Sequence, residues 1–166
     1  FNDTVGTLSL RGGAITGTTG VLTSTSAYDL RSGSVSAILA GSVGLNKTTA
    51  DTVTLSKVNT YSGVTSITGG TLAFSAANNL GDVSAAFVAD ALTLGGATLG
   101  TAGTIDLGAN RGVTLSGDSV LDVTAGSLTL SGIVAGAANL EKTGAGSLTL
   151  SGANTFTGVL TQRAGQ

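Results

Sequence analysis

Short runs in which apolar and hydroxyl residues alternate recur along the whole chain. In each run Leu, Val or Ile stands at every second position with Thr or Ser between, as in residues 52–55 (TVTL) and 148–150 (LTL). Such alternation places the apolar side chains on one face of a β-strand and the hydroxyls on the other. Gly, Asn and Asp bound the runs and favour turns. The pattern predicts short strands with an apolar inner face, including runs at 7–10, 52–55, 92–94, 113–115, 128–130 and 148–150.

The spacing of these runs predicts the architecture. Corresponding runs recur at nearly constant intervals, at Val53, Leu72 and Leu92 and again at Leu128 and Leu148. Within one such interval we expect three strands, because runs begin at Ile105, Val113 and Leu121 before the next one begins at Leu128. A period of about 20–23 residues with two or three short strands is typical of a β-solenoid coil. Asn-Gly and Asp-Gly pairs, which mark tight hairpins, are absent from the sequence.

We therefore predict an all-β fold, a single-stranded parallel β-helix of about seven or eight coils that runs through residues 1–166 as one continuous segment. Gly, at 27 of 166 residues, recurs too often for an uninterrupted long helix. Disorder fits poorly, because 41% of the residues are hydrophobic and the net charge is only −2. The chain begins at Phe1 without Met, and we expect it to be a fragment of a longer repeat protein.

Composition excludes several classes of function. The chain has no His and no Cys, so it has no Ser-His-Asp triad, no Cys nucleophile and no imidazole or thiolate metal site. Seven Lys and Arg residues are too few and too scattered for a phosphate-binding stripe, so we expect no nucleic-acid partner. The apolar stretches are much shorter than a membrane-spanning helix requires, so we expect no membrane insertion by this segment.

A longer repeat lies over the short period. Residues 45–71 align without gaps on residues 140–166, with 12 identities in 27 positions, far more than this biased composition gives by chance. Tyr61 and Phe156 form a conservative pair within the alignment. Eight repeat positions are the candidate structural sites, namely Leu55, Asn59, Tyr61 and Gly63 with their partners Leu150, Asn154, Phe156 and Gly158.

Residues 140–158 (LEKTGAGSLTLSGANTFTG) resemble the autotransporter-associated β-strand repeat, a passenger-associated repeat of bacterial type V secretion. Residues 45–63 resemble a diverged copy, which differs at Thr49, Asp51 and Lys57, where the pattern usually has Gly. The resemblance implies a right-handed helix in a passenger domain that folds at the Gram-negative cell surface. It therefore also implies an extracellular location, and it says little about any molecular target.

The repeat positions favour structural roles. We expect Asn59 and Asn154 to point inward and satisfy turn backbone groups, as an Asn ladder does. Tyr28, Tyr61 and Phe156 are expected to stack inside or along the solenoid rather than to bind sugars. Outward, solvated lysines that discourage sheet aggregation are expected at the two matched positions, Lys47 and Lys142.

The acidic residues provide weak candidates for chemistry. Paired carboxylates would be needed for a polysaccharide lyase or hydrolase, and the nearest pairs are Asp118 with Asp122 and Asp82 with Asp90. We expect all four to be solvated residues of turns and outer faces, and the protein not to be an enzyme. The segment 95–100 (GGATLG) lacks the Asp of a calcium-binding nonapeptide, so we expect no metal and no cofactor.

The expected function is that of a structural or adhesive extracellular stalk in an autotransporter-like passenger. Two alternatives remain open, a subunit of a self-assembling filament or matrix and a carbohydrate-active β-helix enzyme. The expected partners are the chain itself, through coil-to-coil stacking or continuation of the same chain, and host or matrix surfaces. The sequence predicts no specific receptor or ligand-binding residue.

Overall fold

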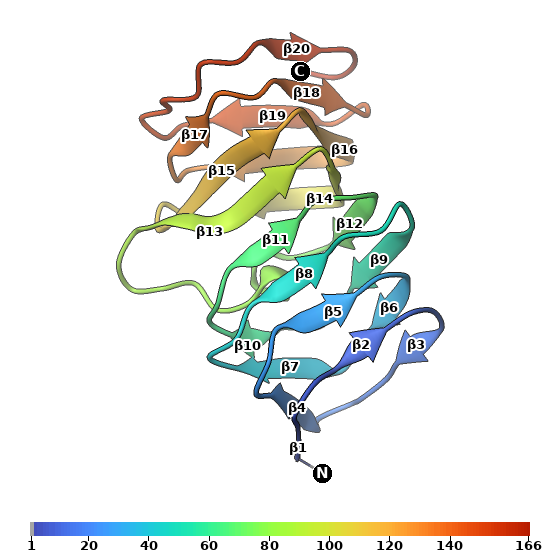
Figure 1. Cartoon of the computed structure of the whole chain (residues 1–166). Helices are drawn as coiled ribbons and strands as arrows, with labels where there is room; N and C mark the ends of the chain where they lie inside the picture. The colour runs from blue at the N-terminus through green and yellow to red at the C-terminus, as the bar shows by residue number, and fades with distance from the viewer. Residues whose placement is uncertain (1) are drawn as a thin grey trace.

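The structure is a computed structural model that describes residues 2–166, and it consists of three parallel sheets that form the sides of an elongated solenoid (Figure 1). A four-stranded sheet contains β1 (Asp3–Val5), β4 (Val21–Ser24), β7 (Ile38–Gly41) and β10 (Thr60–Tyr61). A seven-stranded sheet contains β2 (Ser9–Leu10), β5 (Tyr28–Leu30), β8 (Leu45–Lys47), β11 (Thr65–Ile67), β13 (Val88–Gly95), β15 (Arg111–Gly117) and β17 (Val134–Gly136).

The third sheet has nine strands. They are β3 (Ala14–Ile15), β6 (Gly33–Val35), β9 (Thr52–Leu55), β12 (Thr71–Phe74), β14 (Thr98–Asp106), β16 (Ser119–Leu130), β18 (Leu140–Thr143), β19 (Ser147–Leu150) and β20 (Leu160–Gln162). Every pair of neighbouring strands is parallel, and the chain passes from sheet to sheet around about eight coils. The predicted all-β parallel solenoid is confirmed.

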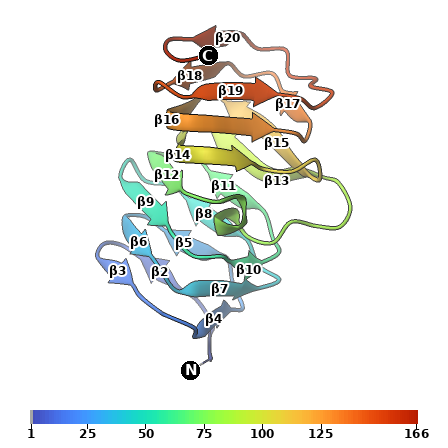
Figure 2. The same ribbon diagram turned by 180° about the vertical axis from the view of Figure 1, so that it is seen from behind.

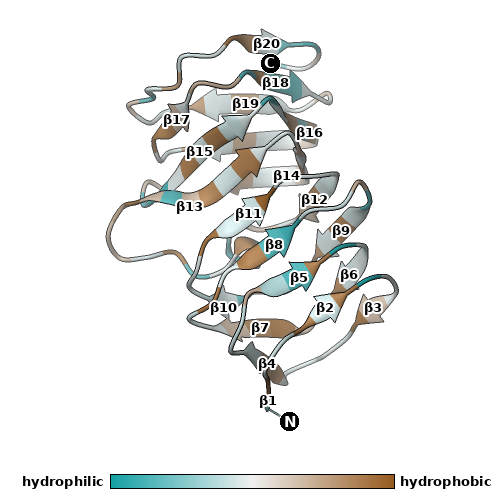
Figure 3. Ribbon diagram, viewed as in Figure 1, coloured by the Kyte–Doolittle hydropathy of each residue, from teal (hydrophilic) through white to brown (hydrophobic). Residues whose placement is uncertain are grey.

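The register stacks like residues on like. In the nine-stranded sheet one inward column runs through Val53, Leu72, Leu99 and Leu121, each paired with the next. All four side chains are buried, whereas Thr54, next to Val53 in its strand, is exposed. Figure 3 shows the same alternation along β13 and β15. The period-2 pattern therefore produces a narrow apolar interior that continues from coil to coil.

Two features differ from the expectation. The spacing places Leu92 in register with Leu72, but Leu72 pairs with Leu99 and Leu92 pairs with Thr65 of the seven-stranded sheet, because this coil contains extra residues between β12 and β13.

The second feature concerns Leu121 and Leu128. They do not begin separate strands, because both belong to the twelve-residue β16. This strand turns the corner between two sides of the solenoid. Its first part pairs with β18 and its second part pairs with β19. A register shift between Thr101 and Ala102 of β14 accommodates that corner. Figure 2, which shows the molecule from behind, has β14, β16 and β19 stacked on the side that faces the viewer.

A single 3₁₀ turn, η1 (Ala77–Leu80), is the one helical element among residues 2–166. It occurs in the longest coil. That coil runs from Leu72 to its partner Leu99, and more residues separate these two than any other pair of bonded partners in this sheet. None of the helical structure in residues 2–166 is long and apolar enough to cross a membrane.

The two copies of the longer repeat lie on different sides of the solenoid. The first copy begins in β8 of the seven-stranded sheet, whereas the second begins in β18 of the nine-stranded sheet. The strands that follow, β9 and β19, both belong to the nine-stranded sheet, where β19 pairs with the second part of the bent β16. The repeat is therefore a strand–turn–strand unit that forms at more than one place around the solenoid.

Candidate functional site

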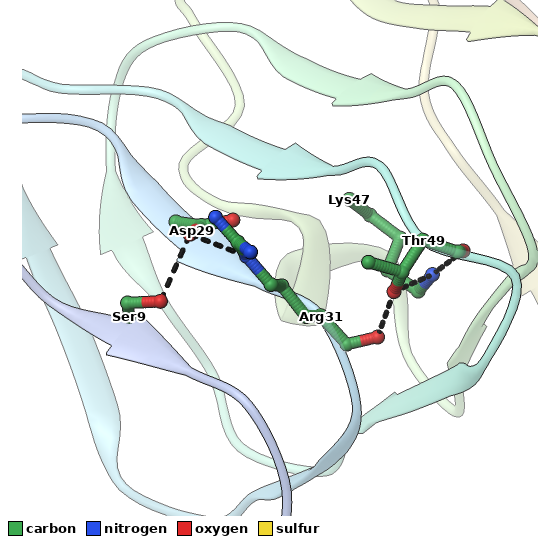
Figure 4. Close-up of polar contacts among 5 residues, drawn as sticks. All are labelled: Ser9, Asp29, Arg31, Lys47 and Thr49. Carbon is green, nitrogen blue, oxygen red and sulfur yellow. Dashed lines mark hydrogen bonds and ion pairs between the residues drawn. The ribbon is translucent and has the colours of Figure 1, made fainter.

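The first repeat contains a buried ammonium group, that of Lys47. Its Nζ donates to the carbonyl oxygens of Thr49 and of Gly69, the latter at 2.9 Å and one coil further on, and it contacts Thr49 Oγ1 at 3.3 Å. Thr49 Oγ1 in turn donates to the carbonyl oxygen of Arg31 in the preceding coil (Figure 4). The cluster links three successive coils through turn carbonyls.

Lys142 repeats this arrangement in the second copy. Its buried Nζ donates to the carbonyl oxygens of Thr143 at 2.6 Å, Gly144 at 2.8 Å and Ala164 at 3.1 Å. Gly144 and Ala164 occupy the repeat positions of Thr49 and Gly69. We call each of these clusters, Lys47 or Lys142 with its carbonyl acceptors, a lysine clamp.

The clamps work by satisfying turn carbonyls that the strand ladders leave free. A buried carbonyl without a donor is costly, and an ammonium group supplies three donors from one side chain. Neither lysine forms an ion pair, because the two ion pairs within residues 2–166 are Arg31 with Asp29 and Arg163 with Glu141. Burial lowers the pKa of Lys47, and the charge of Asp51 partly opposes that shift.

The expectation of solvated lysines at these positions was wrong. Lys47 pairs with Ile67 in the seven-stranded sheet, and Lys142 pairs with Leu121 in the nine-stranded sheet, so both stand in inward columns. The signal was present in the sequence, because each lysine follows an inward Leu by two positions, Leu45 or Leu140. Strand alternation outweighed the general preference of Lys for solvent.

Asn59 and Asn154 both bind backbone groups of neighbouring coils. The Oδ1 of buried Asn59 accepts the N–H of Leu39 at 2.9 Å, and its Nδ2 donates to the carbonyl oxygen of Asn79 at 2.6 Å. The Oδ1 of Asn154, which is half-buried, accepts the N–H of Val134 at 2.8 Å. Leu39 and Val134 precede their asparagines by the same interval, so both copies make the same bond to the preceding coil.

Two tyrosines lie inside the solenoid. Tyr28 and Tyr61 are fully buried, with ring centroids 6.1 Å apart and planes inclined by 56°. The hydroxyl of Tyr61 contacts Thr65 Oγ1 at 2.8 Å, and burial raises the pKa of Tyr61 to about 12. Phe156, the repeat partner of Tyr61, is half-buried and packs against the core. These rings therefore offer no exposed stacking platform.

The remaining repeat positions lie at close contacts between coils. Leu55 is buried and Leu150 is half-buried, both against the core. A Cβ on Gly63 would stand 2.4 Å from the backbone nitrogen of Gly44, and one on Gly158 would stand 2.0 Å from the carbonyl oxygen of Ala138. Only Gly fits where consecutive coils approach so closely.

Three of the four candidate carboxylates are exposed, Asp122 is half-buried, and they have separate roles. Asp118 is exposed and accepts the N–H and Nδ2 of Asn139 at 2.9 and 3.0 Å, and these hydrogen bonds lower its pKa. Asp122 accepts Thr143 Oγ1 at 2.9 Å. Asp82 and Asp90 are exposed residues of the longest coil. No group of three or more acidic residues that could hold a metal ion occurs in residues 2–166.

The stacked parallel coils and the two lysine clamps define the class of this protein. It is a parallel β-solenoid with a repeated strand–turn–strand unit whose lysine bonds to the next coil. The model of the passenger-associated-transport-repeat family matches residues 45–74 and 140–162, the segments that contain the two clamp lysines. The chain therefore carries two passenger-associated-transport repeats, as the resemblance implied.

A curated relative supports the same assignment. The chain is 37% identical over 120 residues, 72% of its length, to a protein of Brucella suis biovar 1 (strain 1330) named adhesin BmaC autotransporter. The matched region is about 3% of that relative's length. Both comparisons support the assignment of an autotransporter passenger repeat to this chain. No solved structure matches the chain significantly.

Proposed function

We propose that this chain is a structural and adhesive segment of an autotransporter passenger that is exposed at the surface of a Gram-negative cell. Two passenger-associated-transport repeats and the similarity to a protein named as an autotransporter adhesin support this role. The segment acts as an extracellular stalk whose mechanism is architectural, with no catalytic step.

The observation that carries the proposal is the unbroken parallel ladder from β3 to β20. Each coil in this sheet pairs with the next, and the lysine clamps tie the intervening turns together. A solenoid whose coils bond only to their neighbours transmits force along its axis and gains length with each repeat. Such a rod has few mobile loops for proteases to cut.

The outer faces suit weak and repeated contact. They are rich in Thr, Ser and Gly, and the net charge is only −2 over 166 residues. Hydroxyl groups can both donate and accept hydrogen bonds, so a lattice of them suits polar host or matrix surfaces without strong charge steering.

Surface display tests this role. The whole chain would be inserted between an outer-membrane translocator and an epitope tag, with a Lys47→Met, Lys142→Met double variant as the matched control. We expect the tag at the cell surface, resistance of the segment to trypsin and greater attachment of the cells to epithelial monolayers than of cells with the translocator alone. The double variant should be cleaved faster. Rapid cleavage of the parent chain, or attachment equal to that of the translocator alone, contradicts the proposal.

A further inference from the structure

The longest coil carries an insertion that no repeat feature explains. After η1 the chain forms an exposed loop, residues 82–87, which projects from one side of the solenoid before β13 (Figure 1). The loop borders a cavity of about 380 Å³ between itself, the turn at residues 62–64 and β13. Insertions in solenoid proteins collect on one face, which is often the binding face.

Two residues of the next coil fix the shape of this loop. The guanidinium of buried Arg111 donates from Nη1 to the carbonyl oxygen of Leu80 at 2.6 Å and from Nη2 to that of Gly81 at 3.0 Å. The Nδ2 of Asn110 donates to the carbonyl oxygens of Ser84 and Ala85, both at 3.0 Å. The loop is thus held in place before any ligand arrives, which lowers the entropy cost of binding.

The start of the loop is equally constrained. Gly81 has a φ of 87°, and a Cβ there would stand 2.7 Å from the ring of Tyr61. The N–H of Asp82 donates to the carbonyl oxygen of Tyr61 at 2.9 Å, and the N–H of Val88 donates to that of Asn110 at 2.9 Å. Both ends of the insertion are therefore anchored to the solenoid wall.

The lining combines hydrogen-bond acceptors with small apolar surfaces. Asp82, Ser62, Ser84 and Asn110 are the polar residues of the lining. Within the loop, Ser84 Oγ accepts the N–H of Ala86 at 3.2 Å and the Nδ2 of Asn110 donates to two carbonyl oxygens, which leaves the Asp82 carboxylate, the Asn110 Oδ1 and the hydroxyl protons for a ligand. Val64, Val83 and Ala91 supply the apolar part, and the first two are exposed. Arg111 adds a positive charge next to the cavity, but its terminal nitrogens bond to backbone carbonyls.

We propose that this cavity binds one neutral pyranose unit of a glycan. A sugar ring presents several O–H donors to the acceptors and a C–H face to the two valines, and the volume lies within the range of small-ligand sites. The carboxylate of Asp82 disfavours an anion, and the nearby charge of Arg111 disfavours an ammonium group. This inference rests on the proposed adhesive role only in what the binding would be used for. Whether the cavity binds a sugar can be measured independently of that role.

The test uses the whole chain and four methyl pyranosides as probes, those of glucose, galactose, mannose and N-acetylglucosamine. Binding is measured by saturation-transfer NMR and by titration of backbone amide shifts. We expect at least one pyranoside to shift amides of residues 62–64 and 82–88. Asp82→Asn should weaken its affinity about tenfold, the loss expected for one charged hydrogen bond. Val83→Arg, which fills the cavity, should abolish binding.

Asp90→Asn is the matched control, because Asp90 is an exposed carboxylate of the same coil outside the lining. It should leave the affinity unchanged, and all variants should keep the parent unfolding midpoint. Absence of binding by all four pyranosides overturns the proposal. It is equally overturned if Val83→Arg still binds, or if N-acetyl-lysine methylamide binds in place of the sugars. Display of Val83→Arg on cells separates the two proposals, because attachment that persists there supports the adhesive role without this site.

Discussion

The ammonium group of Lys142 donates to the carbonyl oxygen of Ala164, one coil further along the chain, at 3.1 Å. Lys47 makes the equivalent bond to Gly69 at 2.9 Å, although its strand lies in a different sheet. The bond therefore belongs to the strand–turn–strand unit and does not depend on the side of the solenoid. Because the acceptor lies one coil away, each repeat stabilises its junction with the next coil.

Removal of a clamp should destabilise the fold. Lys47→Met keeps the length of the side chain but leaves the carbonyl oxygens of Thr49 and Gly69 without their charged donor. We expect the free energy of unfolding to fall by about 2 kcal/mol, measured by urea titration. Lys57→Met is the control, because Lys57 is only half-buried and its side chain forms no hydrogen bond within residues 2–166. Equal losses in both variants would contradict the clamp.

The two asparagines should differ in their contribution. Asn59→Ala leaves both the N–H of Leu39 and the carbonyl of Asn79 without partners in the interior, and we expect a loss of about 2–3 kcal/mol. Asn154→Ala leaves only the N–H of Val134, at a half-buried position, and should cost about 1 kcal/mol. Denaturant unfolding of the two variants provides the comparison. A larger loss at Asn154 would show that burial does not set the order.

The outline of the fold could be predicted from the sequence because strand alternation and the coil period are local. The period holds where Val53 pairs with Leu72 and Leu128 pairs with Leu148. It fails at the longest coil, where Leu72 pairs with Leu99 and not with Leu92. The long corner-turning β16 could not be predicted, because nothing in the residues around Leu121 and Leu128 distinguishes a bent strand from two strands. That difference depends on packing between coils.

Buried Tyr61 should make stability depend on alkaline pH. Its pKa is about 12 in the fold, compared with about 10 in an unfolded chain, because burial disfavours the phenolate. Below pH 10 both states keep the proton. Between pH 10 and 12 the unfolded state loses it first, so the free energy of unfolding should fall as the pH rises, by about 2–3 kcal/mol in total.

Ultraviolet absorbance at alkaline pH measures this directly, because the chain has two Tyr and no Trp. In a Tyr28→Phe variant only Tyr61 ionises, and the midpoint should lie near 12 while circular dichroism still reports a folded chain. A midpoint near 10 in the folded state would place the ring in solvent.

The strand register can be tested with one matched pair. Leu55→Asp places a carboxylate in the apolar interior and should cost several kcal/mol, whereas Thr54→Asp on the outer face should cost little. Leu150→Asp should fall between the two, because Leu150 is only half-buried. Thermal unfolding of the three variants gives the order. Equal damage at Thr54 and Leu55 would contradict the inward and outward assignment.

The site was less predictable than the fold for a physical reason. Lys47 and Lys142 follow the strand alternation, but their acceptors Gly69 and Ala164 lie in turns of the next coil, and the coil length decides which turn that is. Arg111 has no repeat partner, and its contacts depend on the inserted loop. Pairings of this kind require the three-dimensional structure, whereas the inward position of the lysines was visible in the sequence.

We propose finally that the chain by itself associates end to end. The outermost strands of the nine-stranded sheet, β3 and β20, each pair on one edge only, so backbone donors and acceptors are open at both ends of the stack. Val159 and Leu160 at the β20 end are 64% and 46% exposed. Because the two ends differ, their contact is heterologous and does not close, and it should produce elongated assemblies.

Small-angle scattering over a concentration series should show particles that lengthen at constant cross-section. A Val159→Lys, Leu160→Lys double variant should remain monomeric, because stacking on the β3 end of the next copy would remove the two ammonium groups from water. Val58→Lys is the matched control, since Val58 is 48% exposed in the loop between β9 and β10, away from both ends, and it should associate as the parent does. A compact monomer at millimolar concentration would contradict end-to-end pairing. Association that persists in the double variant but fails in Val58→Lys would indicate contact through the side of the solenoid.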